Sequence, residues 1–559
     1  MGIIDKYKES ISMYTRRNFL KMAEVAGATG LANPIKAFCA KNQISSDYFG
    51  VHEFIENHPD AVFIMQSDVD KKTNNDAKKQ VGLDFGRSVF VPKDNTGFLI
   101  SSIVPIKPNL KPDVAKDPVN RMGMDTDAFF VEGIIESLKD IGLSGDQFYM
   151  REAWCISNGK GGSADWDANG FAGVCERTGA NLKDCEIGVG GLPAEDINWV
   201  DVPDGVWYRK IPYLWPINVK DGFLLNIAKF KTHGMGLTLC SKNMQGTVSK
   251  PYTALCQSIT ASYGSMNPEN FRLPDGKAEI YANYDRHNAD GIPRWDKPGS
   301  SGDSGLGQET WSTRTLDNLS TMSFGLNIIE GIYGRDGNGH SNGPNPAGNE
   351  NNSRGMAWDH MSNVVIFGKN PIHVDNIGHW LGGHEPGNFG FFHLALERKM
   401  SSYLDPKSIP VYLWKDGVAT LTPLDDFERT MLMTNYLTRN YNGQTENCWH
   451  LANEPFDYGS VSVEPPYTNG KAEAFILSRN IPNLFNPYTS IEYSIPSAGN
   501  VRIEIFNASG QLIDVLVNGQ MSRGSHMAVW NTSNQSSGVY TYRFRFGGFN
   551  KTETITLLK

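Results

Sequence analysis

The sequence predicts an α/β protein in which an open, mostly parallel sheet is flanked by helices and followed by a small all-β, immunoglobulin-like sandwich. Apolar segments typical of strands take turns along the chain with helical patterns, as they do in βαβ units. The 559 residues include 57 glycines and 29 prolines, which favours a loop-rich α/β architecture over a helical one. This length is too great for one average domain, so we expect two or three.

The α/β domain is expected over residues 87–459, after a variable polar segment at 41–86. Two helical patterns cover residues 127–142 and 371–382. We expect strands within residues 88–92, 97–106, 148–154, 222–230, 325–331 and 363–368.

The overall charge limits the classes of partner. The formal net charge is −9, which disfavours a general binder of nucleic acid or of anionic membranes, because both need an excess of basic residues. No stretch after residue 40 is apolar over the roughly 20 residues that a membrane span needs. We therefore expect no nucleic-acid partner and no transmembrane span in the mature chain.

The N-terminus carries a pair of arginines, Arg16 and Arg17, within residues 15–21 (TRRNFLK). A weakly apolar stretch of small residues follows at 22–40. The combination resembles a twin-arginine export signal, which implies that residues 1–40 are a signal peptide read by the Tat translocase. The alternative is a short amphipathic helix with two solvated arginines.

The C-terminus has a strand pattern. Val501, Ile503 and Ile505 alternate with Arg502 and Glu504, as in half-buried strands, and SG at 509–510 is typical of a hairpin turn. These short strands predict the β-sandwich.

Residues 477–559 resemble the C-terminal sorting domain of type IX secretion substrates, and residues 460–476 read as a linker before it. The resemblance implies export by the type IX machinery to the outer-membrane surface or the medium. The alternative is a generic carbohydrate-binding or spacer sandwich.

A cluster of basic residues occupies the segment 229–247, KFKTHGMGLTLCSKNMQGT. If a strand continues to residue 233, its period of two places Lys229, Lys231 and His233 on one face. Glycines then allow a turn, and residues 237–245 are expected to form a helix.

That helix would carry Thr238, Lys242 and Asn243. A helix N-terminus aimed at the same place as Lys231 and His233 would favour an anion such as a carboxylate or phosphate. The alternative is that the lysines are solvated and His233 is a structural histidine.

The order of several segments resembles the DUF362 family, whose activity is not settled. They are IVPIKPNL, DAFFVEGIIESLKDIG, NIAKFKTHGMGLTLCSKNMQG, GIYGRDGNGHSNGP and NPIHVDNIGHWLGG. The resemblance implies shared polar positions at Lys107, Asn109, Lys231, His233, Lys242, Asn243, Gly337, Gly339 and Asp375. Many relatives carry iron–sulfur modules, but the seven cysteines here form no C-x₂-C-x₂-C run, so we expect no iron–sulfur cluster.

The glycine-rich loop at 334–348 lacks the spacing of a dinucleotide fingerprint or a P-loop. Asp375 and His379 are four residues apart on one helical face, which suits a carboxylate with a basic or metal-binding partner. The alternative is that His379 is an ordinary core or surface histidine.

A calcium-loop spacing occurs at Asp165, Asp167, Asn169 and Glu176, with Gly170 between them. The alternative is an Asp/Asn turn that begins the helix around residues 172–177. A divalent metal therefore remains open as a cofactor.

Two functions are consistent with these residues. One is an enzyme for a small anionic substrate, with Lys231 and Lys242 holding the anion, His233 as acid or base, and Asp375 orienting a partner; Lys107, Asn109, Lys229, Thr238, Asn243, Gly337 and Gly339 would line the site. The other is a surface protein that binds such a ligand without turning it over.

Overall fold

The computed structural model describes residues 46–110, 122–153, 155–156, 164–185, 188–233, 236–252, 259, 275–300, 304–337, 357–434, 455–459, 476–477, 484–485, 488–495, 499–521, 524–532 and 535–557. The expected signal peptide and most of the expected linker lie outside these ranges. The chain divides into a smaller unit, Met1–Gly50 with Pro92–Ile100, and a larger one, Val51–Val91 with Ser101–Lys559. β1 (Tyr48–Val51) pairs antiparallel with β4 (Phe98–Leu99), and β3 (Phe90–Lys93) is the third strand of this sheet.

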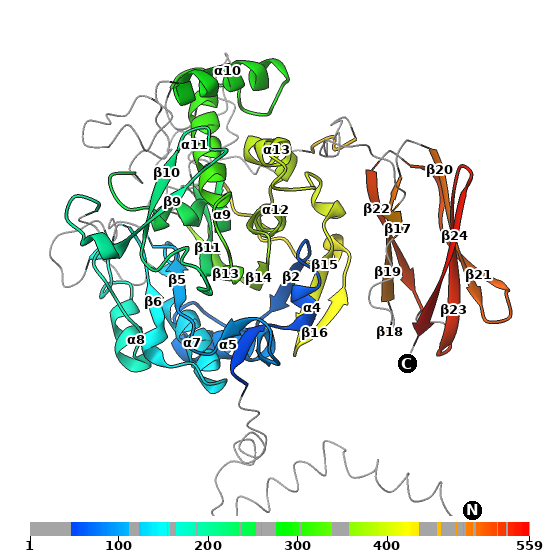
Figure 1. The fold of residues 1–559 in the computed structure, drawn as a ribbon, viewed down its shortest axis with the longest axis horizontal. Coiled ribbons are helices and arrows are strands. Elements are labelled where there is room, and N and C mark those ends of the chain that lie inside the picture. Colours follow the sequence, from blue (N-terminus) through cyan, green and yellow to red (C-terminus); the bar gives the residue numbers. More distant parts are fainter. Residues whose placement is uncertain are drawn as a thin grey trace, which may run out of the picture. The chain divides into compact units, whose positions relative to one another are not determined.

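The larger unit contains a nine-stranded sheet of order β16-β15-β2-β14-β13-β11-β5-β6, with β12 paired to β11 (Figure 1). Its strands are β2 (Val62–Gln66), β5 (Val104–Pro108), β6 (Phe148–Met150), β11 (Leu225–His233), β12 (Gly236–Thr238), β13 (Leu326–Arg335), β14 (Asp359–Gly368), β15 (Val411–Lys415) and β16 (Val418–Leu421). The pairings make β12, β14 and β16 run opposite to the other six strands. The prediction of a mostly parallel sheet is confirmed.

The sheet begins earlier in the chain than the sequence suggested. β2 lies between β14 and β15, and the helix α5 (Asn75–Val89) follows it. Val62 and Ile64 of β2 are fully buried in the core. Residues 62–89 therefore belong to the α/β sheet and its helical layer, and the expected boundary at residue 87 is too late.

Helices cover both faces of the sheet, with α5 and α7 (Ala128–Asp140) on one face and α9 (Cys240–Asn243), α11 (Gly305–Leu319) and α12 (Pro371–Leu381) on the other (Figure 1). α5 and α7 approach closely through glycines, since a Cβ on Gly82 would come within 2.0 Å of the Phe130 carbonyl oxygen. The remaining helices are α4 (Glu53–Glu56), α8 (Phe171–Thr178), α10 (Asp275–Ala289) and α13 (Gly390–Glu397).

Local capping explains where the two expected helices begin. The Asp127 side chain accepts hydrogen bonds from the backbone N–H groups of Phe129 and Phe130 at the start of α7. Asn370 does the same for α12, and Pro371 occupies its first turn. Both helices agree with the periodicity in the sequence.

Two sheets, antiparallel except for the parallel pairing of β18 with β24, form the C-terminal part. One has the order β17-β19-β22 and the other β18-β24-β23-β20-β21. Their strands are β17 (Ile476–Leu477), β18 (Leu484–Phe485), β19 (Tyr488–Ile495), β20 (Gly499–Asn507), β21 (Leu512–Met521), β22 (Gly524–Asn531), β23 (Gly538–Phe546) and β24 (Phe549–Leu557). Side chains from both sheets, such as Trp530 and Tyr542, share one buried cluster, so the expected β domain is present.

Short elements complete the larger unit. β9 (Ile197–Asp201) and β10 (Lys210–Leu214) form a hairpin, and β7 (Cys155–Ile156) pairs with β8 (Ala164–Asp165). Single 3₁₀ turns lie at Gly145–Gln147, Ala194–Asp196, Met244–Thr247, Pro386–Asn388, Pro406–Ser408 and Leu424–Asp426. None of the helices in the described ranges combines the length and the apolar character that a membrane span requires.

Candidate functional site

Two buried cations meet where β11 and β13 approach their carboxyl ends. Lys231 on β11 and Arg335, the last residue of β13, are partners in the parallel register and are only 3% and 4% exposed. In open α/β sheets, ligands bind beyond the carboxyl ends of the strands. We call Lys231, His233, Arg335 and Gly337 the strand-end site.

The strand-end site has defined contacts on the α7 side of the sheet. The Lys231 ammonium donates to the backbone carbonyl of Met124, which precedes α7. Arg335 makes a two-bond pair with Asp359 at 2.7 and 2.9 Å, and Lys72 donates to the same carboxylate at 2.5 Å. Burial alone would raise the pKa of Asp359, but Arg335 and Lys72 lower it, so this carboxylate is ionised.

Lys229 belongs to a separate buried ion pair. Its ammonium donates to both oxygens of Glu330, at 2.7 and 3.0 Å, and lies 3.3 Å from the ring centroid of Tyr333. Tyr333 donates to Asp127 at 2.8 Å, and Lys78 donates to the same Asp127 oxygen at 2.5 Å. Burial lowers the pKa of Lys229 and raises those of Glu330 and Tyr333. These contacts give Lys229 a structural partner, whereas the sequence placed it in a ligand site.

The structure brings Lys107, Asn109 and Asn243 together. The Lys107 ammonium donates to Glu152 at 2.6 Å and to the side-chain oxygen of Asn243 at 2.9 Å. Asn109 donates to that same oxygen at 3.1 Å. The Asn243 amide in turn donates to Asn226 on β11 at 2.9 Å. We call these residues, with Asn327, the asparagine cluster.

The asparagine cluster is distinct from the strand-end site. In the register, Lys107 lies opposite Asn226, which precedes Lys231 by five residues on β11. Five strand residues span roughly 16 Å. The structure therefore gathers the predicted residues into two groups, where the sequence suggested one.

The segment after β11 folds differently from the expected helix at 237–245. Residues 236–238 form β12, which pairs back onto β11 with Lys231 opposite Thr238. Gly236 has a φ of 114°, which a residue with a side chain rarely adopts. α9 then covers only Cys240–Asn243, and Lys242 on it is half-buried. His233 is half-buried too, and its carbonyl accepts from the Thr434 hydroxyl.

The side chain of Asp375, a residue of α12, binds the backbone at the start of α9. Its two carboxylate oxygens accept from the backbone N–H groups of Cys240 and Ser241, each at 2.7 Å. The anion at this helix start is therefore a side chain of the protein itself. Burial raises the pKa of Asp375 to about 7, and burial together with the Asp375 charge raises the pKa of the Cys240 thiol well above its usual value.

Asp375 and Lys231 lie on opposite faces of the sheet. α12 and Cys240 pack in one cluster with Ala228 and Phe230, the β11 residues that alternate with Lys229 and Lys231. The structure consequently does not bring the Asp375 carboxylate to Lys231. His379, on the same helix, donates through its Nδ1–H to the Asp375 carbonyl at 2.9 Å, and burial lowers the pKa of His379 to about 3.

The calcium-loop residues lie around the start of α8. The Asn169 side chain accepts from Phe171 N–H, and Gly170 has a φ of 85°. Glu176 is exposed on α8, while the side chain of Asp165 is outside the described part of the structure. Within the described ranges, no three His, Cys, Asp or Glu side chains are grouped as metal ligands would be.

Of the two expected glycines in the loop after β13, Gly337 has a φ of 91° and donates to the Met433 carbonyl at 2.6 Å. Gly339 lies outside the described residues. The left-handed backbone at Gly337 explains why a glycine is needed immediately after Arg335 and Asp336.

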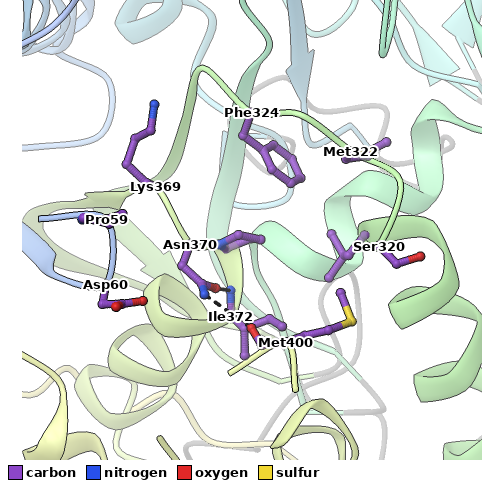
Figure 2. A pocket seen from close by; sticks show the side chains of 11 residues that line it. Pro59, Asp60, Ser320, Met322, Phe324, Lys369, Asn370, Ile372 and Met400 are labelled. Carbon is purple, nitrogen blue, oxygen red and sulfur yellow. Dashed lines mark hydrogen bonds between the residues drawn. The ribbon is translucent and has the colours of Figure 1, made fainter. Parts of the chain in front are cut away.

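An open hollow of about 470 Å³ lies elsewhere, where β14 ends and α12 begins (Figure 2). Apolar side chains such as Phe324, Met322 and Met400 line it, with Lys369 and Asn370 at its edge. Asn370 already caps α12, and Lys369 donates to the Gly325 carbonyl at 3.2 Å. Because β14 runs opposite to β13, this hollow lies at the amino-terminal edge of the parallel strands, away from the strand-end site.

Sequence reasoning did not identify five buried polar residues that make the contacts described above, namely Glu152, Asn226, Asn327, Glu330 and Arg335. One signal was available. Leu-Asn-Ile begins both β11 and β13, and the two asparagines are register partners joined by a 2.8 Å hydrogen bond. An asparagine inside an apolar strand indicates a buried polar contact.

Residues 104–379 match the DUF362 domain of unknown function. The DUF362 region runs from the first residue of β5 to His379 in α12, and it contains the strand-end site and the asparagine cluster. No curated protein matches the chain. Because the function of this domain is unknown, the family match assigns no activity to the chain.

Proposed function

We propose that the DUF362 region binds and acts on a small anionic substrate at the strand-end site. The observation that carries this proposal is the pairing of Lys231 and Arg335, two buried cations from adjacent parallel strands, at the carboxyl ends of those strands. Charged side chains are rarely buried without a specific role, and loops at this edge are where α/β proteins bind ligands.

The roles follow from position. Lys231 and Arg335 hold the anion through charge-assisted hydrogen bonds. His233, two residues beyond Lys231 on the same strand, is the group for proton transfer. Asp375 has a structural part in this proposal, because its bonds to Cys240 and Ser241 fix the start of α9, which carries Lys242, on the opposite face of the sheet. The asparagine cluster ties β5, β11 and Glu152, which follows β6, to α9.

Binding is tested by titrating the full chain with inorganic phosphate and with succinate in a calorimeter. Lys231→Met keeps most of the side-chain stem and removes the charge. Affinity should fall at least tenfold, or about 1.4 kcal/mol. Lys407→Met is the matched control, since Lys407 forms an exposed pair with Asp425. Equal affinity in wild type and Lys231→Met would contradict the proposal.

Turnover distinguishes an enzyme from the alternative, a binding protein without catalysis. Once a turned-over anion is found by screening small carboxylates and phosphate esters, His233→Gln should lower kcat while leaving KM within a few fold. If binding is clear but no compound in the screen is turned over, the binding-protein alternative is the better account.

We further propose that the protein is exported by the twin-arginine route and sorted by the type IX machinery. The support is the pair Arg16 and Arg17 and the two-sheet β domain at the C-terminus. Arg16→Lys with Arg17→Lys should stop export of a reporter fused to residues 1–40. Removing residues 477–559 should leave the protein in the periplasm. Export of the double variant, or surface delivery of the truncated chain, would contradict the respective step.

A further inference from the structure

α11 is buried along its whole length although it carries three charged side chains, Glu309, Arg314 and Asp317. Charged groups are rarely buried unless another group compensates them. The hydrogen-bond and ion-pair partners of each charged group therefore indicate which of the three charges are compensated and which is not.

The carboxylates of Glu309 and Asp317 each have several hydrogen-bond donors around them. Glu309 accepts from His287 and from the indole N–H of Trp295, both at 2.6 Å. Asp317 pairs with Arg398 at 2.8 Å. It also accepts from the backbone N–H groups of residues 206, 207 and 208 at 2.7 to 3.1 Å. Neither carboxylate is left for Arg314.

Arg314 lacks such compensation. It is 3% exposed, and no carboxylate in the described part of the chain lies within ion-pair distance of it. Its Nη2 donates weakly, at 3.2 Å to the Tyr208 hydroxyl and at 3.4 Å to the Tyr252 carbonyl. Its Nε and Nη1 have no hydrogen-bond partner among the residues that the structure describes.

The surroundings of the guanidinium are rigid and aromatic. Its carbon lies 5.5 Å from the ring centroid of Trp207 and 5.8 Å from that of Tyr208. The bonds from these two residues to Asp317 fix their backbone against α11. The planar N–H fork of a guanidinium beside these rings matches the two oxygens of a carboxylate or phosphate.

We infer that Arg314 is a binding site for an oxyanion group, a carboxylate or a phosphate, carried by a small ligand. Arginine stays protonated in proteins, so an isolated buried guanidinium requires a negative partner. The free N–H groups on Nε and Nη1 are the positions that such an anion fills. This inference stands independently of the strand-end site.

Thermal unfolding of the dialysed full chain tests the inference, with inorganic phosphate in one arm and acetate in the other. The unfolding midpoint of the wild type should rise with the concentration of at least one of them. Arg314→Met should lose that rise and, without added anion, should unfold at a higher temperature than the wild type, because an uncompensated buried charge has been removed. Arg87→Met, at an exposed arginine on α5, keeps Arg314 and should respond as the wild type does, so any rise that remains in Arg314→Met is the general salt effect.

Because phosphate also suits the strand-end site, the titration is repeated in a Lys231→Met background, where only the Arg314 response remains. Arg314→Lys is the second variant should Arg314→Met not fold. It keeps the charge but loses the fork, so phosphate or acetate should bind at least tenfold more weakly. The inference is overturned if neither anion raises the unfolding midpoint of the wild type, or if the Arg314 variants respond as the wild type does.

Discussion

Replacing Asp375 with asparagine should change how the stability of the protein depends on pH. The buried Asp375 carboxylate accepts from Cys240 N–H and Ser241 N–H at 2.7 Å each. Burial raises the pKa of this group from 3.8 to about 7, against the effect of these hydrogen bonds. The folded state therefore binds the Asp375 proton more tightly than the unfolded state does.

The size of the change in stability with pH follows from the difference in proton binding by Asp375 between the folded and unfolded states. Tighter proton binding in the folded state means that the contribution of Asp375 to stability is greatest at low pH and is lost as the pH rises from about 4 to about 7. For a shift of this size, the loss between pH 5 and pH 8 is about 2–3 kcal/mol. Asparagine does not titrate, so Asp375→Asn has no such loss.

Urea unfolding of both proteins between pH 5 and pH 8 measures the effect. The free energy of unfolding of the wild type minus that of Asp375→Asn should fall by about 2–3 kcal/mol across this range. Asp425→Asn, at an exposed carboxylate, controls for the change in net charge. A difference that is constant with pH, or that rises with it, would refute the reasoning about burial at α9.

Three other perturbations have defined outcomes. Lys107→Met leaves Glu152 buried without its partner and should lower the free energy of unfolding by about 3–5 kcal/mol in urea. Burial alone would lower the pKa of His287, but its hydrogen bonds to Glu309 and Glu397 raise it to about 9. The stabilisation by His287 is therefore complete below pH 6.5 and lost as the pH rises through about 9, so His287→Gln should approach the wild type in stability at alkaline pH. Gly236→Ala should destabilise the hairpin after β11 by about 1–3 kcal/mol, because φ is 114° there.

Each of these predictions has its own control. Adding Glu152→Leu to Lys107→Met should restore part of the lost stability, and no recovery would argue against a buried charge as the cause. For His287, a wild-type advantage that grows above pH 9 would contradict the assigned ion pairs. Gly190→Ala is the comparison for Gly236→Ala, since a Cβ at residue 190 meets nothing within 4 Å, and equal effects at both sites would remove the backbone argument.

The sheet and its main helices follow from local pattern. Strands β5, β6, β11, β13 and β14 overlap the segments predicted as strands, and helices α7 and α12 lie within those predicted as helices, because apolar alternation and capping residues act over a few positions. β2 and α5 were missed because they lie in a segment whose composition is largely polar. Their place in the sheet comes from pairing with β14, almost 300 residues later.

The site was less predictable, because its decisive contacts are distant in sequence. Lys229 pairs with Glu330 and Lys107 with Glu152, and no local rule connects residues that are 101 and 45 positions apart. The same holds for Asp375, whose contact with Cys240 spans 135 positions. The strand period did place Lys229 and Lys231 on one face correctly, but it could not show that this face looks away from α9 and Asp375.

Hydrogen exchange of the full chain with and without a small anion tests the central claim most directly. Saturating succinate or phosphate should slow amide exchange in peptides that cover the end of β11, near Lys231, and the end of β13, near Arg335. Lys231→Met should lose this protection, while any protection of α11 through Arg314 should persist. Unchanged exchange at both strand ends, with an anion bound elsewhere in the chain, would contradict the strand-end site.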